Sequence, residues 1–324
     1  MKKSIIFLAI CFLFFQKQIL SQNTLKTPVW GYAVYESLQK HKPEYWEKTI
    51  PKLKVLSISG FRLNKRGKLK FRNPAKEVLL IARKHNVKIY PMVTFVSGNE
   101  GILFLKKGES RNIAVLEISK FLDKYQYDGI HIDFEYMPVS LLPPFQEFLT
   151  SLKAKLNKNN KALSMALFPQ IDFPKEWSSF HDVKVLANSV NEFVLMSYDY
   201  HGSKSEEPGP ITEIAWTQKN VEYILKFISS DRLWLGIPAY GYEWNAQTKK
   251  AVVVTEKNGI SKMKKYKFQR HKSGCIYYTY KSRKGNTMEG YFSDKETRNQ
   301  LEIIANKYNL KGIGVWRLGF EIEL

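Results

Sequence analysis

Short apolar segments rich in β-branched and aromatic residues recur along the chain and alternate with segments whose apolar residues have helical spacing. The predicted strands are Val29 to Tyr35, Val55 to Phe61, Val87 to Phe95, Gly129 to Glu135, Ala162 to Phe168, Phe193 to Tyr198, Leu233 to Tyr240 and Gly312 to Trp316. The predicted helices between them include Ala75 to His85, Ile113 to Tyr125, Pro144 to Leu156, Thr217 to Ser229 and Lys295 to Tyr308.

This alternation over 324 residues predicts an α/β fold, a (β/α)8 TIM barrel. An open doubly wound sheet is the alternative, but it requires a glycine-rich phosphate turn after the first strand, and none follows Val34. Between about residues 245 and 294, short apolar strands flank a basic stretch and predict a small β-rich insertion after the seventh strand. The insertion could form part of the active-site rim or a structural cover, and the sequence leaves both open.

The fourth predicted strand carries three polar side chains at alternate positions, which places them on one face: His131, Asp133 and Glu135. An amphipathic edge strand facing water has the same pattern. In a barrel, however, these residues approach the C-terminal end of the strand, where this fold carries its catalytic groups. Two neighbouring carboxyl groups raise one pKa, so that a general acid keeps its proton near neutral pH.

Four motifs occur in order along the chain: Asp128-Gly129-x-x-x-Asp133-x-Glu135, Met196-Ser197-Tyr198-Asp199, Gly236-Ile237-Pro238-Ala239-Tyr240-Gly241 and Gly314-Val315-Trp316. Together they resemble the motifs of glycoside hydrolase family 18, the chitinase-like family, over nearly everything after residue 28. The segments from Ile132 to Glu135 and from Gly314 to Gly319 resemble the subgroup of spore-cortex N-acetylglucosaminidases and chitobiases more closely.

The resemblance implies an enzyme, a glycosidase acting on N-acetylglucosamine-containing polysaccharides or oligosaccharides of the chitin or peptidoglycan type. It implies that Glu135 is the catalytic acid and base, that Asp133 orients the substrate's acetamido group and that Tyr198 hydrogen-bonds to that group. The acetamido oxygen then acts as the nucleophile, so no second enzyme carboxylate attacks the sugar. A catalytically inactive lectin on the same barrel is the alternative function, but such lectins usually lack the acid that Glu135 supplies.

The resemblance also implies a set of substrate-binding residues. Trp316 would form the apolar floor beneath the sugar, where an aromatic ring suits a pyranose face. Asp199 would add a polar contact at the mouth, and Tyr240 and Met196 would lie at the same cleft, with packing as the alternative role for Met196. Asp128 is predicted to be structural, as an anchor for the start of the strand.

His131 departs from the resemblance, because many chitinases have aspartate at that position. It could accept a hydrogen bond, or it could be protonated beside Asp133 and lower the pKa of that acid. We hypothesise that His131 belongs to the substrate-binding site and tunes the pH optimum without abolishing activity.

The N-terminus predicts export. Lys2 and Lys3 precede an apolar run from Ile5 to Phe15, and this pattern predicts a signal peptide over residues 1–21, cleaved near Ser21. The run is shorter than the roughly 20 residues that span a bilayer, so we expect a secreted or periplasmic monomer without stable membrane insertion. Cleavage would leave one cysteine, Cys275, which we interpret as a buried, unreactive thiol.

The composition of the chain indicates which classes of partner to expect. The formal net charge of +21 is typical of a solvated basic surface or of contact with an anionic polymer. The basic residues lie in diffuse loops without the signatures of RNA-binding sheets, so we expect no nucleic-acid partner. We also expect no cofactor and no metal, since the histidines at positions 131, 181, 201 and 271 lack recognised ligand spacing.

Overall fold

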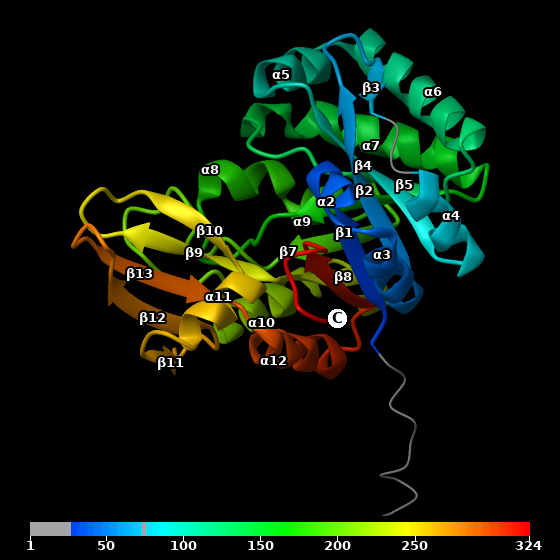
Figure 1. The fold of residues 1–324 in the computed structure, drawn as a ribbon. Helices are drawn as coiled ribbons and strands as arrows, with labels where there is room; N and C mark the ends of the chain where they lie inside the picture. Colours follow the sequence, from blue (N-terminus) through cyan, green and yellow to red (C-terminus); the bar gives the residue numbers. More distant parts are fainter. Residues whose placement is uncertain (1–26, 73–75) are drawn as a thin grey trace, which may run out of the picture.

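The computed structural model describes residues 27–72 and 76–324, so the predicted signal peptide, with Cys11 and Ser21, and Ala75 lie outside the described residues. Eight parallel strands form a closed barrel in the order β1-β14-β8-β7-β6-β5-β4-β2, and pairing between β1 and β2 closes the ring (Figure 1). The predicted (β/α)8 barrel is confirmed, and an open sheet is excluded. The barrel strands are β1 (Val29–Ala33), β2 (Val55–Leu63), β4 (Lys88–Phe95), β5 (Gly129–Ile132), β6 (Ala162–Leu167), β7 (Glu192–Met196), β8 (Leu233–Pro238) and β14 (Gly312–Trp316).

Helices cover the outside of the barrel (Figure 1). The five that match predicted segments are α4 (Lys76–Lys84), α6 (Gly108–Lys124), α7 (Leu142–Asn157), α10 (Ile214–Ile224) and α12 (Lys295–Lys307). The others are α2 (Tyr35–Lys40), α3 (Pro43–Thr49), α5 (Gly98–Lys106), α8 (Lys175–Ser178), α9 (Val183–Leu186) and α11 (Glu256–Met263), with 3-10 turns η1 (Ile50–Lys52), η2 (Val139–Leu141), η3 (Ser179–His181) and η4 (Ser230–Arg232). None of the helices in residues 27–72 and 76–324 is long and apolar enough to cross a membrane.

The alternation along β5 divides its side chains between two environments. Ile130 and Ile132 pack outward, in the apolar layer between the strands and the helices. Phe134, just beyond the strand, lies in the same layer and stacks on Phe95 with ring centroids 3.8 Å apart. His131 points into the barrel. This outward apolar burial stabilises the strand and leaves its polar residues facing the interior.

The regular part of β5 is shorter than predicted, because it ends at Ile132 and not at Glu135. The N–H of Asp133 still donates to the carbonyl of Val93, at 2.9 Å. Beyond that bond the chain leaves the strand ladder, so Asp133 and Glu135 lie where the barrel opens and not within its wall.

A second, antiparallel sheet of five strands follows β8, in the order β10-β9-β13-β12-β11. Figure 1 shows it in yellow to orange beside the barrel. Its strands are β9 (Tyr240–Asn245), β10 (Ala251–Thr255), β11 (Phe268–Arg270), β12 (Ile276–Lys281) and β13 (Thr287–Phe292). A short strand, β3 (Leu69–Phe71), pairs separately with β2.

This sheet is the β-rich insertion predicted after the seventh barrel strand, but it begins at Tyr240, before the predicted start near residue 245. The seventh strand correspondingly ends at Pro238 and not at Tyr240. The difference has a physical cause: the main chain at Gly241 pairs with both Val254 and Phe292, so the chain has already left the barrel there. Cys275, within the insertion, is fully buried, and burial raises the pKa of its thiol to about 11, as expected for an unreactive side chain.

We expect Gly241→Ala to destabilise the protein. A Cβ atom at Gly241 would lie 1.9 Å from the carbonyl oxygen of Tyr291, and both neighbouring main chains belong to one sheet. The strands must separate to make room for the Cβ atom. We expect this to reduce the free energy of unfolding by about 1–3 kcal/mol, which thermal unfolding measures.

The matched control is Gly98→Ala at the first residue of α5. There the added Cβ meets only Met137 Cε, at 3.9 Å, so stability should be unchanged or higher. Equal unfolding midpoints for the two variants would contradict this account.

Candidate active site

A cavity of about 160 Å³, the central cavity, lies at the C-terminal end of the barrel strands. It brings together residues from β1, β4, β5, β6, β7 and β14 or the positions just beyond these strands. Its lining includes the predicted residues His131, Asp133, Glu135, Met196, Tyr198, Asp199 and Trp316, together with Tyr32, Met92 and Ala166. Segments far apart in the sequence therefore form a single site.

Asp133 and Glu135 form the acidic centre of this cavity. Burial raises the pKa of Asp133, while a hydrogen bond with Glu135 opposes that rise. Burial also raises the pKa of Glu135, and the charge of Asp133 raises it further. Because two adjacent carboxylates repel each other, the pair holds a proton into the neutral range, with Glu135 as the group that retains it.

His131 lies beneath these acids and is almost fully buried. Its Nε2 is 3.2 Å from the hydroxyl of Tyr32, and its Nδ1 is 3.0 Å from Oγ of Ser164. Burial lowers its pKa to about 3, so the ring is uncharged at any pH near neutrality. Of the two alternatives raised by the sequence, the structure favours a neutral, hydrogen-bonded histidine over a cation beside Asp133.

Tyr198 and Asp199 follow directly after β7. Tyr198 lines the cavity, and its hydroxyl has no protein hydrogen-bond partner among residues 27–72 and 76–324, which leaves it available to a ligand. Asp199 has a φ of 57°, in the left-handed region. Its Oδ1 accepts hydrogen bonds from the hydroxyls of Tyr240, at 2.7 Å, and Tyr242, at 3.3 Å. These two tyrosines belong to β9, so the insertion fixes an acid of the barrel.

The pKa of Asp199 reflects opposing effects. Burial raises it, and the hydrogen bonds from Tyr240 and Tyr242 lower it. Tyr240 itself is buried and does not line the central cavity. The structure shows Tyr240 in contact with Asp199, and the contact with substrate that the sequence predicts for Tyr240 stays a prediction.

The remaining predicted residues take distinct positions. Trp316, at the end of β14, has its ring stacked against that of Tyr198, with centroids 6.4 Å apart and an interplanar angle of 18°. Met196 is 7% exposed and lines the cavity wall. Asp128 lies at the opposite end of β5, where its Oδ2 accepts a hydrogen bond from the N–H of Ile89, at 2.8 Å, and ties β5 to β4.

The cleft widens on one side of the central cavity into a hollow of about 530 Å³, the aromatic lobe. Glu135, Met196, Tyr198 and Asp199 line both spaces. The lobe adds the rings of Tyr136, Phe168, Phe173, Trp177, Tyr200 and Tyr242.

Tyr136 is 55% exposed and packs edge-on against Trp177, with centroids 5.1 Å apart. Such rings suit the apolar faces of sugars. The motifs in the sequence do not single out these residues. The position of Tyr136 directly after Glu135 is a usable signal, whereas Trp177 lies in α8, a segment without one. The sequence does not single out Tyr32 either. Alternation along β1 places its side chain on one face of the strand, but it does not tell which face points into the barrel.

This arrangement can supply a proton, hydrogen-bond donors and an aromatic surface at one point. In the described parts of the chain, no cluster of histidine, cysteine, aspartate and glutamate side chains has the grouping of a metal site. The groups that face the central cavity are those of acid–base chemistry: the carboxyl groups of Asp133, Glu135 and Asp199 and the phenol hydroxyl of Tyr198.

The fold and this site define a glycosidase barrel. The family model described as Glycosyl hydrolases family 18 matches residues 29–321, and the chain therefore belongs to that family. The predicted family and enzyme class are confirmed.

Comparison with known proteins adds relatives of two kinds. The chain is 22% identical over 308 residues to the cortical fragment-lytic enzyme of Bacillus subtilis, covering 89% of this chain and 69% of the relative. The solved spore cortex-lytic enzyme SleL of Bacillus megaterium has a TM-score of 0.80 at 23% identity and covers 92% of this chain and 72% of that one. A solved chitinase from Chromobacterium violaceum has a TM-score of 0.81 at 18% identity, with 91% and 95% covered. At these identities the structural likeness shows the shared fold.

We expect Glu135→Gln to make the protein more stable, and increasingly so as pH rises. The pKa of Glu135 is raised in the folded state, so its contribution to stability falls once pH exceeds the ordinary pKa of glutamate. Glutamine carries no such penalty, and a gain on the order of 1 kcal/mol is expected at pH 8, with little gain at pH 4. Thermal unfolding at the two pH values measures it, with Glu77→Gln on the surface of α4 as control; a gain independent of pH would contradict this account.

Position 131 gives a separate test of pH dependence. Because neutral His131 and asparagine are both uncharged, His131→Asn should shift the pH profile of kcat/KM only slightly. His131→Asp adds a fourth carboxyl to the cavity that holds Asp133, Glu135 and Asp199, and it should move the acidic limb upward by about one pH unit. If both variants had the same pH profile as wild type, residue 131 would have no influence on the pKa values of Asp133 and Glu135.

Proposed function

We propose that this protein is an exported glycosidase that cleaves β-1,4 bonds in N-acetylglucosamine-containing glycans, with Glu135 as acid and base. The observation that carries the proposal is the convergence of Asp133, Glu135, Tyr198 and Trp316 on one cavity at the barrel mouth. Family membership supports the same chemistry. The proposal of export rests on the N-terminal sequence alone.

In the first half of the proposed reaction, protonated Glu135 gives its proton to the glycosidic oxygen. The acetamido oxygen of the substrate attacks the anomeric carbon as the bond to the leaving sugar breaks. Asp133 stabilises the positive charge that develops on the acetamido nitrogen, and the free hydroxyl of Tyr198 orients the same group.

In the second half, ionised Glu135 takes a proton from water. The water oxygen attacks the anomeric carbon, the acetamido group is released, and the configuration is retained. The raised pKa of Glu135 suits both roles, since the group must carry a proton first and accept one later. Trp316 supplies the floor on which the sugar ring rests.

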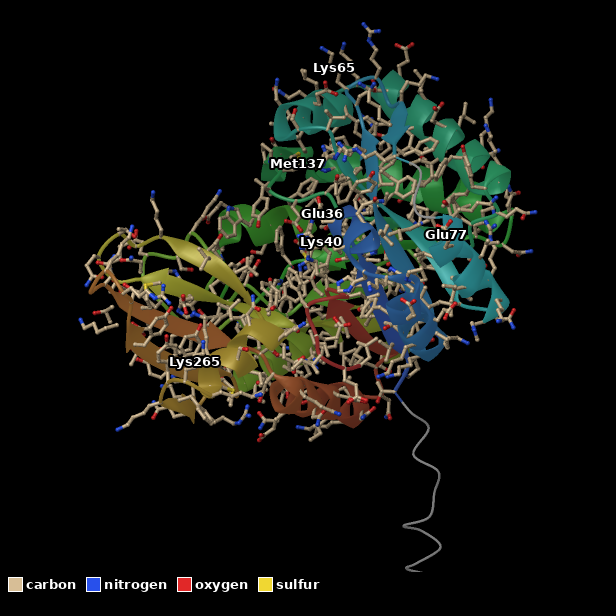
Figure 2. All side chains as sticks on the ribbon, in the orientation of Figure 1. Glu36, Lys40, Lys65, Glu77, Met137 and Lys265 are labelled. Carbon is tan, nitrogen blue, oxygen red and sulfur yellow. The ribbon has the colours of Figure 1, made fainter. Side chains whose placement is uncertain are left out.

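The decisive test is turnover of an aryl-chitobioside, soluble chitin oligomers and purified peptidoglycan by wild type and by Glu135→Gln. We expect the substitution to lower kcat/KM by about 10²–10⁴-fold, because the acid and base are lost together. Glu77→Gln, on the outer surface of α4 and far from the barrel mouth in Figure 2, serves as the matched control and should retain full activity.

Two outcomes would overturn the proposal. Equal turnover by Glu135→Gln and wild type would eliminate Glu135 as the acid. Retained glycan binding without turnover of any of the three substrates by wild type would identify a lectin.

A further inference from the structure

We propose that the cleft opposite the aromatic lobe binds a carboxylate-bearing sugar of an acidic N-acetylhexosamine glycan, and that this protein therefore prefers peptidoglycan-type strands to neutral chitin-type strands. The inference rests on the proposed function, because it specifies the substrate class of the same cleft. The relevant space, the basic lobe, has a volume of about 580 Å³ and is lined by Tyr35, Glu36, Arg62, Lys70, Phe71 and Arg72, among others.

The basic lobe adjoins the acids of the active site. Met92 lines both the basic lobe and the central cavity. Thr94 lines the basic lobe and also a side cavity whose wall includes Asp133 and Glu135. A polymer seated over Glu135 therefore reaches this lobe within the next few sugars.

The charge of the lobe is not neutralised by the protein. Arg62, Lys70 and Arg72 form no ion pair with any carboxylate in residues 27–72 and 76–324, and residues 1–26 and 73–75 contain no aspartate or glutamate. Glu36 is the single acid of the lining, and its Oε2 is 3.7 Å from Nη1 of Arg317. These three cationic side chains therefore line the cleft without a carboxylate partner in the described residues.

The strand pairing concentrates these charges. Arg62 on β2 lies directly opposite Lys70 on β3, and like charges at such positions destabilise an antiparallel pair. Arg72 continues from β3, where its N–H donates to the carbonyl of Gly60, at 3.3 Å. Its guanidinium group lies over the ring of Tyr35, 5.0 Å from the centroid. A cluster that costs folding stability and is held toward a cleft is typical of a ligand site.

The chemistry of the cluster selects carboxylates. Arginine presents paired N–H donors that match both oxygens of a carboxylate, and lysine adds a mobile charge. The aromatic lobe differs, since Lys204 is the only cation that lines it among residues 27–72 and 76–324. The two sides of the cleft thus suit a polymer in which a neutral N-acetylated sugar is followed by one that carries a carboxylate.

The test compares binding by two triple variants, each made in the Glu135→Gln background so that no glycan is consumed. One carries Arg62→Gln, Lys70→Gln and Arg72→Gln. The control carries Lys264→Gln, Lys265→Gln and Lys267→Gln, three exposed residues of the insertion; Figure 2 shows Lys265, in the turn between α11 and β11, away from Glu36. Both variants lose the same formal charge.

The probes are glycan strands of peptidoglycan, with and without stem peptides, and neutral chitin oligomers of equal length. We expect the ratio of the Kd for neutral oligomers to the Kd for acidic strands to fall at least tenfold in the basic-lobe variant and to be unchanged in the control. The salt dependence of acidic-strand binding should fall in the same variant. A loss on peptide-free strands would support a carboxylate of the sugar as the ligand, whereas a loss confined to strands with stem peptides would assign the lobe to peptide carboxylates and overturn that part of the inference.

Three results would overturn the inference: equal weakening for acidic and neutral glycans, the same loss in the control, or displacement of the acidic strand by a single-stranded DNA oligonucleotide of equal charge. The last would identify a general polyanion surface. The inference and the proposed function fail separately. Charge-dependent binding without turnover by wild type would eliminate the hydrolase alone, and turnover without a charge-dependent preference would eliminate the inference alone.

Discussion

The packing of Phe134 is the contact on which the active site depends. Its ring stacks on Phe95 and lies within 5.8 Å of the ring centroid of Phe145 in the layer between barrel and helices. Its carbonyl oxygen is 2.8 Å from Nε2 of buried His181. Because neighbouring side chains point in opposite directions, an outward Phe134 forces Asp133 and Glu135 inward. The chemistry of the barrel mouth is thus set by an apolar contact outside it.

The interior that receives these acids is unusual for a barrel core. Below them lie the neutral ring of His131 and the hydroxyl of Tyr32, while Trp316 and Tyr198 close the sides. None of these four groups carries a positive charge that would offset the effect of burial, which raises the pKa of both acids. The fold accepts the cost of burying these carboxyl groups, and their raised pKa values keep a proton on the pair near neutral pH.

The sequence predicted those parts of the site that lie on strands or directly after them. Alternation fixes orientation, so the inward placement of His131, Asp133 and Glu135 followed from the pattern in one segment and was found in the structure. Trp177 could not be predicted in the same way. It lies on the four-residue helix α8, whose position over the cleft depends on tertiary contacts with Phe173 and Tyr136.

The predicted end of the seventh strand at Tyr240 was wrong for a related reason. The apolar run through Pro238 reads as one strand, yet the main chain passes from the barrel to the second sheet within it. Periodicity detects neither that change of sheet nor the long-range pairing of Gly241 with Phe292 that produces it. The cation cluster of Arg62, Lys70 and Arg72 likewise depends on the pairing of β2 with β3, a contact that the periodicity of the sequence does not predict.

The hydrogen bonds from Tyr240 and Tyr242 to Asp199 have an evolutionary consequence. An insertion that only covered the barrel could be exchanged or lost among relatives as a module. Here the first strand of the insertion supplies two of the donors that hold an active-site acid in a left-handed backbone conformation. If this insertion were transferred to another barrel, β9 would have to be transferred with the rest of the insertion. The natural boundary for recombination therefore lies at Ala239, between the two sheets.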